Sequence, residues 1–180
     1  MPTMYPEISE TMEWDSRNRI QFTLLFLMEE YPYSRITVSQ LCQAAKVSRQ
    51  TYYRLFDTKD DILILHLHGI MSEYLLSKIL LGTTSTPELL QFFLFFSGYQ
   101  NLLDLLYKNN KMFLLQHVLV KYSNVFISEP IFRIAHGYDY AAEFVASTLC
   151  SVLTVWAKME FKTGCSTLAN YTSQFLKGIW

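Results

Sequence analysis

Residues 37–63 read T-V-S-Q-L-C-Q-A-A-K-V-S-R-Q-T-Y-Y-R-L-F-D-T-K-D-D-I-L, and this stretch decides the fold. Thr37, followed three residues later by Gln40, has the spacing of a capping box and predicts the start of a short helix. Ser48 is a good N-cap for a second short helix. Two short helices joined by so tight a turn predict a helix-turn-helix motif over about residues 37–56.

The residue types within this motif favour DNA binding. Cys42 and Ala45 are small enough for the two helices to cross closely. The second helix then turns Arg49, Gln50 and Tyr53 outward. Arginine and glutamine match the edges of guanine and adenine in the major groove, whereas hydroxyl groups suit phosphate oxygens. The alternative is an ordinary helical hairpin with a solvated charged face.

Local charge agrees with DNA binding, although the charge of the whole chain does not. The chain has a formal net charge of −1. Residues 46–59 carry four basic residues and one acidic residue, which gives this short stretch a charge of +3. A basic stretch on a nearly neutral chain indicates a local site for an anionic partner.

The stretch also resembles the DNA-binding signature of the TetR family of bacterial transcriptional regulators. The shared features are Thr-Val at the start of one helix, Ala-Ala near its end, Val-Ser-Arg before Thr-Tyr-Tyr, and Lys-Asp-Asp-Ile-Leu at the start of the next long helix. The resemblance covers Arg19 to about Leu65. It implies an all-α protein of about nine helices, with a three-helix DNA-binding domain over residues 1–62 and a helical effector-binding and dimerisation domain over residues 63–180.

The resemblance assigns roles to individual residues. Thr37, Tyr53 and Lys59 would anchor phosphates, while Arg49 and Gln50 would read bases with help from Thr51. Tyr52 is expected to pack inward, with a contact to the DNA backbone as the alternative. The family usually has glycine at position 46, because the turn there tends to be left-handed, and Lys46 would add a phosphate contact; Leu55 replaces a frequent histidine. The predicted DNA-binding residues are Thr37, Lys46, Ser48, Arg49, Gln50, Thr51, Tyr52, Tyr53 and Lys59.

Apolar spacing along the chain is helical almost throughout, and almost nothing has the alternation of a strand. The prolines stand where helices could start or stop. Outside the motif we predict helices over residues 16–31, 59–81, 87–107, 111–126, 130–136, 139–161 and 166–177. Gly164 is expected to stop the penultimate helix, and Ser166 to cap the last.

The C-terminal part resembles one branch of the same family, through Tyr140-Ala141-Ala142-Glu143-Phe144 and the later Trp156. The resemblance implies that the last two helices pair with those of a second subunit in a four-helix bundle. The alternative is that their apolar faces are buried within one subunit. The predicted interface residues are Val145, Leu149, Val152, Trp156, Tyr171 and Phe175.

The resemblance further implies an effector pocket between the fourth and eighth helices, a region rich in phenylalanine and tyrosine. Such a lining would suit a small apolar or aromatic molecule. The alternatives are that these residues form a core without a cavity, or that a protein partner replaces the effector. The predicted lining residues are Tyr74, Phe96, Tyr99, Phe113 and Tyr122.

Several function classes lack support. Three scattered cysteines and four histidines without metal-ligand spacing predict no disulfide framework, no metal site and no cofactor. Phosphate-binding loops, nucleophile motifs and paired catalytic carboxylates are absent from the sequence, so no enzyme activity is expected. Polar residues interrupt the apolar stretch at 89–107, which predicts a buried helix and no membrane span. The N-terminus lacks the pattern of a signal peptide, which indicates a cytoplasmic protein.

The predicted function is that of a ligand-responsive repressor, acting as a homodimer on a palindromic, double-stranded DNA operator. One alternative is a similar DNA-binding protein without a small effector, controlled by a protein partner. The other is a helical interaction module that has lost DNA binding, an interpretation that rests on Lys46 and Leu55.

Overall fold

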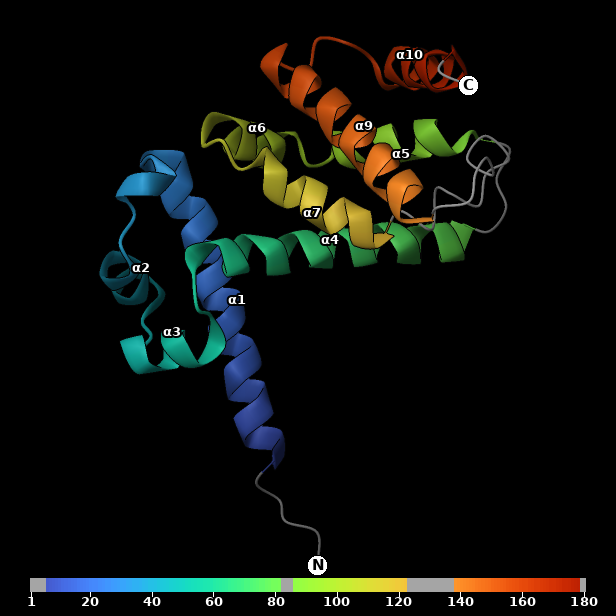
Figure 1. Ribbon diagram of the computed structural model, residues 1–180. Helices are drawn as coiled ribbons and strands as arrows, with labels where there is room; N and C mark the ends of the chain where they lie inside the picture. The colour runs from blue at the N-terminus through green and yellow to red at the C-terminus, as the bar shows by residue number, and fades with distance from the viewer. Residues whose placement is uncertain (1–5, 82–85, 123–137, 179–180) are drawn as a thin grey trace, which may run out of the picture. The chain divides into compact units, whose positions relative to one another are not determined.

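The computed structural model describes residues 6–81, 86–122 and 138–178 (Figure 1). Within these ranges the chain forms nine α-helices and one 3-10 turn, and it contains no β-strand there. The prediction of an all-α protein is therefore confirmed.

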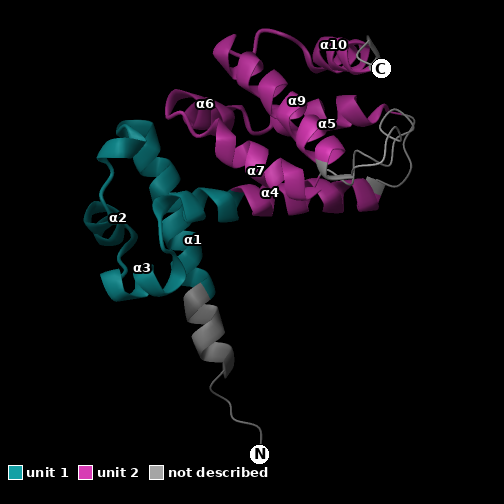
Figure 2. Ribbon diagram, in the orientation of Figure 1, with its two compact units in different colours: residues 1–66 teal, residues 67–180 magenta. Residues whose placement is uncertain are grey.

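Contacts between residues divide the chain into two compact units, residues 1–66 and residues 67–180 (Figure 2). The boundary falls inside α4, which spans Lys59–Leu81 and so contributes residues to both units. The sequence placed a domain boundary at residue 62, close to the start of this helix.

Unit 1 is built from four helices and a 3-10 turn. α1 starts well before the predicted position, because the apolar stripe on which that prediction rested begins only at Ile20, and a helix can extend beyond its buried face. α2 and α3 pack on each other and on α1. The elements of unit 1 are α1 (Pro6–Glu30), η1 (Tyr33–Arg35), α2 (Val38–Ala45), α3 (Arg49–Leu55) and the start of α4.

Three helix starts in unit 1 are capped, and the caps at Thr37 and Ser48 are those that the sequence predicts. The hydroxyl of Thr37 accepts from the amide three residues on at 3.1 Å, and that of Ser48 does the same at 2.9 Å. At α4 the cap is reciprocal, because the Thr58 amide donates to the Asp61 carboxylate at 2.7 Å and the Asp61 amide donates to the Thr58 hydroxyl at 3.3 Å. Each cap satisfies amides that the helix itself leaves without partners, which typically stabilises a helix by about 1 kcal/mol.

The turn between α2 and α3 passes through a left-handed residue. Lys46 has φ 54° and ψ 44°, the conformation that the family resemblance led us to expect at this position. The chain then closes the turn with a hydrogen bond from the Val47 amide to the Cys42 carbonyl at 3.0 Å. A side chain is strained in this region, so Lys46 destabilises the turn where glycine would not.

Within the part that the structure describes, unit 2 holds the rest of α4 and five further helices. Among its described residues, α7 packs against α9, α9 also packs against α6, and α10 packs against α5. The further helices are α5 (Glu88–Ser97), α6 (Gln100–Lys108), α7 (Met112–Tyr122), α9 (Tyr138–Lys158) and α10 (Cys165–Gly178). The helix predicted at residues 130–136 lies outside the described residues.

Three predictions about helix ends in unit 2 are wrong. Ser166, expected to cap the last helix, lies within α10, which begins at Cys165. The single helix expected over residues 87–107 is broken at Gly98, where the amides of Gly98 and Tyr99 donate to carbonyls only three residues back. This tighter turn ends α5 and lets α6 leave in another direction. The helix expected to reach residue 161 ends at Lys158, because Glu160 and Phe161 have φ values of 53° and 57°. Gly164 therefore lies beyond the end of α9 and does not stop it.

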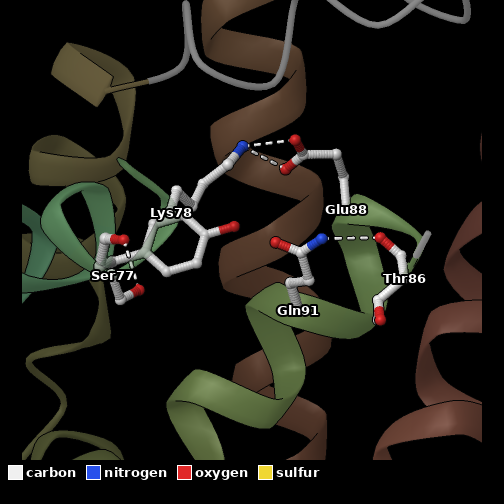
Figure 3. A network of polar contacts seen from close by, with 6 residues as sticks. Ser77, Lys78, Thr86, Glu88 and Gln91 are labelled. Carbon is white, nitrogen blue, oxygen red and sulfur yellow. Dashed lines mark hydrogen bonds and ion pairs between the residues drawn. The ribbon is translucent and has the colours of Figure 1, made fainter. Parts of the chain in front are cut away.

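An ion pair joins the end of α4 to the start of α5. The Lys78 ammonium bonds both carboxylate oxygens of Glu88, and only 20% and 25% of the two side chains is exposed (Figure 3). The same ammonium lies 5.9 Å from the centroid of the Tyr74 ring. Beside it, the Gln91 side-chain amide donates to the Thr86 carbonyl at 2.7 Å. The ion pair thus holds the end of α4 against the start of α5 within unit 2.

Two helices, α4 and α9, are long and apolar enough to cross a membrane when judged by length and composition alone. Both contribute fully buried side chains to the packed units, such as Leu67 of α4 and Leu153 of α9. The apolar run Phe92–Phe96 belongs to α5, whose ten residues are too few for a span of about 20 residues.

The strain at residue 46 gives a direct prediction for stability. The substitution Lys46→Gly removes the side chain from the left-handed conformation and is expected to raise the free energy of unfolding by about 0.5–1 kcal/mol. Urea unfolding of the full chain measures this change. The matched substitution Lys46→Ala removes the same charge but keeps the strain. An equal gain in Lys46→Ala would show that loss of the charge, and not relief of strain, is responsible.

Candidate DNA-binding surface

The contact between α2 and α3 positions the candidate surface. Cys42 and Ala45 are buried at 4% exposure each, which confirms that small residues lie where the two helices meet. Leu41 and Tyr52 are fully buried beside them. Because the inner face of α3 is fixed in this way, its opposite face is held toward solvent.

The exposed face of α3 carries the residues that were predicted to read DNA. Arg49, Gln50 and Tyr53 are exposed, and Thr51 is half-buried. Thr37 and Ser48 are also exposed, while their hydroxyls already cap the two helices. An N-cap hydroxyl beside free helix amides is a suitable position for a phosphate contact.

Tyr52 does not belong to this surface. Its side chain is 0% exposed, and its ring packs edge-on against Tyr53 and near Phe56, with centroids 5.2 and 6.1 Å away. Burial raises the pKa of the Tyr52 hydroxyl to about 12. The hydroxyl has no hydrogen-bond partner among the described residues. Placing Tyr52 among the DNA-binding residues was therefore wrong, because the helical spacing that exposes Tyr53 turns Tyr52 into the core.

Arg49 has a partner that the sequence reasoning missed. A nitrogen of its guanidinium donates to the hydroxyl of Ser39, which is exposed on α2. The contact joins the two helices on the solvent side and restricts the directions in which the guanidinium can point. Its only signal in the sequence is a serine two residues after the Thr37 cap.

Lys59 is directed into unit 1. Its ammonium donates to the Tyr33 carbonyl at 2.7 Å and to the Ile36 carbonyl, and it lies 4.2 Å from the centroid of the Tyr33 ring. The Tyr33 hydroxyl donates to the Asp60 carboxylate. Burial, together with this carboxylate, raises the pKa of Tyr33. Lys59 thus ties the start of α4 to η1, whereas a phosphate anchor needs donors that point outward.

The basic charge of the surface is smaller than the sequence count indicates. Lys46, Arg49 and Arg54 are exposed, as is the acidic Asp57, whereas Lys59 is half-buried against the carbonyls of η1. Three exposed bases and one exposed acid still favour an anionic partner at this face.

The structure does not bring the five predicted pocket residues together. Tyr74 and Phe96 are 1% exposed and belong to a packed cluster with Phe92, Phe95 and Tyr99, in which neighbouring ring centroids are 4.7–6.4 Å apart. Phe113 is instead 55% exposed on α7. Tyr122, near the end of α7, bonds His68 of α4. This cluster is core, as the alternative interpretation of the sequence held.

Half of the predicted interface residues are also core. Val145, Leu149 and Trp156 are each 2% exposed, and the Trp156 indole donates to the Thr163 carbonyl at 2.8 Å. Their assignment to a dimer interface was wrong, because this face of α9 is buried within the subunit.

The other three predicted interface residues line an open groove of about 630 Å³ between α9 and α10. Tyr171 and Phe175 are exposed at 64% and 58%, and Val152 is half-buried. Four serine and threonine residues lie among the apolar residues of the lining, and none of the lining residues is charged. The apolar lining consists of Phe144, Val152, Val155, Leu168, Tyr171 and Phe175.

Comparison with known proteins supports the helix-turn-helix. The model of the family described as bacterial regulatory proteins, tetR family, matches residues 25–64. The match extends from within α1 into α4 and so includes α2, α3 and the turn between them. A search of curated proteins finds no match to the chain. Among the described residues there is no group of histidine, cysteine or acidic side chains that could hold a metal ion.

The direction of Lys59 predicts an unusual response to salt. The substitution Lys59→Met should destabilise unit 1 by about 1–3 kcal/mol, because it removes charged hydrogen bonds to the Tyr33 and Ile36 carbonyls. DNA affinity should fall, while the slope of log affinity against log salt concentration stays unchanged. Loss of a phosphate contact would instead lower that slope by about 0.9.

The matched control is Lys46→Met, which removes the same charge from an exposed position and keeps the strain of the turn. This substitution should lower the salt slope and leave thermal stability nearly unchanged. If Lys59→Met lowered the slope without any loss of stability, Lys59 would be a phosphate anchor after all.

Proposed function

Because this chain belongs to the TetR family and is a DNA-binding transcription regulator, we propose that it is a cytoplasmic repressor that acts as a homodimer on a palindromic operator. The observation that carries the proposal is the exposed face of α3, which presents Arg49 and Gln50 to solvent. The capped helix α2 packs closely on α3 and holds it in place. In the proposed complex this face enters the major groove.

The roles of individual residues follow from their chemistry and exposure. Arg49 offers two parallel donors to guanine, and Gln50 offers a donor and an acceptor to adenine. Thr51 lies beside them. Thr37, Ser48 and Tyr53 contact phosphates through hydroxyls, and Lys46 adds a charge at the turn.

We propose that the groove between α9 and α10 is covered by the same groove of a second copy. Its uncharged lining, with exposed Val155, Tyr171 and Phe175 beside small hydroxyl residues, allows helices to approach closely and to bury apolar surface. A two-fold interface uses the same patch on both subunits, and it would give the operator its palindromic form. Two short recognition helices on two half-sites bind DNA more tightly than one helix on one half-site.

In the proposed mechanism, an effector bound in unit 2 changes the distance between the two α3 helices of the dimer. Only a ligand that binds one spacing more tightly than the other can shift the equilibrium toward DNA release. The packed state of the aromatic cluster around Phe92 and Phe96 favours a ligand site elsewhere in unit 2, or control by a protein partner as the second candidate.

Sequence selection tests the proposed reading of DNA. Selection from random duplexes at two salt concentrations should recover a palindrome. The substitution Arg49→Ala should relax the preference at one position of each half-site by about 1–3 kcal/mol. Ser39→Ala should have a smaller effect at the same position, because it only frees the guanidinium of Arg49.

The control for Ser39→Ala is Ser34→Ala, which alters another exposed serine of unit 1. Recovery of sequence-independent binding alone would contradict the proposed operator. An Arg49→Ala variant with unchanged preference would remove Arg49 from the set of base-reading residues.

The proposed dimer gives a prediction for oligomeric state. Phe175→Glu places a charge in the α9–α10 groove and should convert the dimer into a monomer, as measured by light scattering. DNA affinity should fall with it, because each monomer holds one half-site. The matched control is Leu94→Glu, which alters an apolar residue of α5 that is 52% exposed and does not line the groove. A Phe175→Glu variant that remained dimeric would show that the interface lies elsewhere.

A further inference from the structure

A polar cluster lies where α4 and α7 meet in unit 2, between helices that are otherwise rich in apolar residues. We call it the α4–α7 cluster and define it as His68, Ser72, His117, Lys121 and Tyr122. His68 Nδ1 lies 3.2 Å from the Tyr122 hydroxyl, and the two rings are 5.7 Å apart. The same hydroxyl is 3.4 Å from the Ser72 hydroxyl, which itself donates to the His68 carbonyl at 2.9 Å. The contacts therefore join the two helices at a defined point.

The basic groups of the cluster are not neutralised by the part of the chain that the structure describes. His117 and Lys121 are exposed, lie one turn apart on α7, and form no ion pair or hydrogen bond with a described residue. Other lysines of unit 2 do pair with acids, namely Lys78, Lys108 and Lys162.

No acidic residue of α4 or α7 forms an ion pair with these groups. α7 has no acidic residue, and the carboxylate of Glu73, the one acidic residue of α4 after His68, accepts a hydrogen bond from the Tyr99 hydroxyl at 2.7 Å. The cluster is thus a local group of hydrogen-bond donors and positive charges that have no ion-pair partner among the described residues.

The electrostatics of His68 agree with this arrangement. Burial lowers the pKa of His68, and the positive charges of Lys121 and His117 lower it further. His117 and Lys121 lie one turn apart on α7, and Lys121 precedes Tyr122, whose hydroxyl lies 3.2 Å from His68 Nδ1, so both basic groups belong to the helix that contacts His68. A negative charge placed among the three would remove this repulsion.

We propose that the α4–α7 cluster binds the anionic group of a small molecule, a carboxylate or a phosphate. Such a group only accepts hydrogen bonds, and the cluster supplies the Lys121 ammonium and two imidazoles as donors. The anion selects the His68 tautomer in which Nδ1 accepts from the Tyr122 hydroxyl and Nε2–H donates to the anion.

If the cluster is the effector site of the proposed repressor, it identifies that effector as an anion, and this role rests on the proposed function. Tyr122 and His68 belong to different helices, so an anion that binds both α4 and α7 stabilises one arrangement of the two. α4 also carries the capped start at Thr58 and Lys59 in unit 1. Binding itself, however, needs no DNA and is tested separately.

The test is calorimetric titration of the full-length protein with benzoate and with inorganic phosphate, at constant ionic strength in chloride. We expect saturable binding of at least one of these anions and no binding of neutral benzamide. The two anions distinguish a carboxylate site from a phosphate site. Lys121→Gln and His117→Gln should each weaken binding at least tenfold. The matched control Lys158→Gln, at an exposed lysine of α9, should leave the affinity unchanged.

Absence of saturable binding for both anions would overturn the proposal, and so would equal affinity in Lys121→Gln and the unaltered protein. Circular dichroism checks that the variants fold, and two-bond ¹H–¹⁵N spectra report the tautomer of His68 when the anion binds. DNA affinity without anion is measured in parallel and should not change in Lys121→Gln. Failure of DNA binding would therefore contradict the proposed function alone, whereas failure of the titration would contradict the anion site alone.

Discussion

The left-handed backbone at residue 46 is the constraint on which the DNA-binding surface depends. It ends α2 and turns the chain so that α3 can start two residues later, at the Ser48 cap. The sharp turn brings Cys42 and Ala45 against α3 and buries Tyr52. The opposite face of α3 is exposed as a consequence. A lysine at this turn costs about 1 kcal/mol relative to glycine, and burial of side chains as large as Leu41 and Tyr52 exceeds that cost.

A second constraint acts at the other end of the motif. The Lys59 ammonium satisfies two carbonyls of the 3-10 segment, and the Tyr33 hydroxyl satisfies the Asp60 carboxylate. The Tyr33 carbonyl also accepts from the Ile36 amide at 3.3 Å, so Lys59 adds a charged donor to a turn that is already hydrogen-bonded and ties the start of α4 to it. The same contacts withdraw one positive charge from the DNA-binding face. Stability of the motif and its electrostatic attraction for DNA therefore compete for this one side chain.

The parts of this structure that the sequence predicts are the local ones. The hydroxyl caps at Thr37 and Ser48 depend on residues within one turn, so spacing alone predicts them. The direction of Lys59 depends on Tyr33, which is distant in sequence, and no spacing rule relates the two. The break at Gly98 was missed because the flanking apolar residues continue a helical pattern on both sides.

The candidate interface shows a different limit of sequence reasoning. α9 is apolar on more than one face, and composition cannot decide which face is buried within the subunit and which is exposed. Trp156 packs on Phe93 of α5 and on Phe161, whereas Val155, next to it in sequence, points into the groove. The large aromatic residue was the more obvious choice for an interface, and it is a core residue. The size of an apolar side chain predicts that it is buried, but not whether it is buried within its own subunit or against a second one.

The small exposed charge on and beside α3 bears on how the proposed repressor gains affinity. Lys46, Arg49 and Arg54 are its exposed bases on and beside α3, and Asp57 opposes them. Few phosphate contacts mean weak sequence-independent binding, since that binding depends on the counterions released per contact. A surface of this kind would bind random DNA weakly and would depend on the proposed base contacts of Arg49 and Gln50. Two copies of such a surface, held at a fixed spacing, add their binding energies only on a site with both half-sites. A weakly charged recognition surface and an apolar groove in unit 2 thus suit each other in the proposed dimer, because dimerisation would supply the affinity that charge does not.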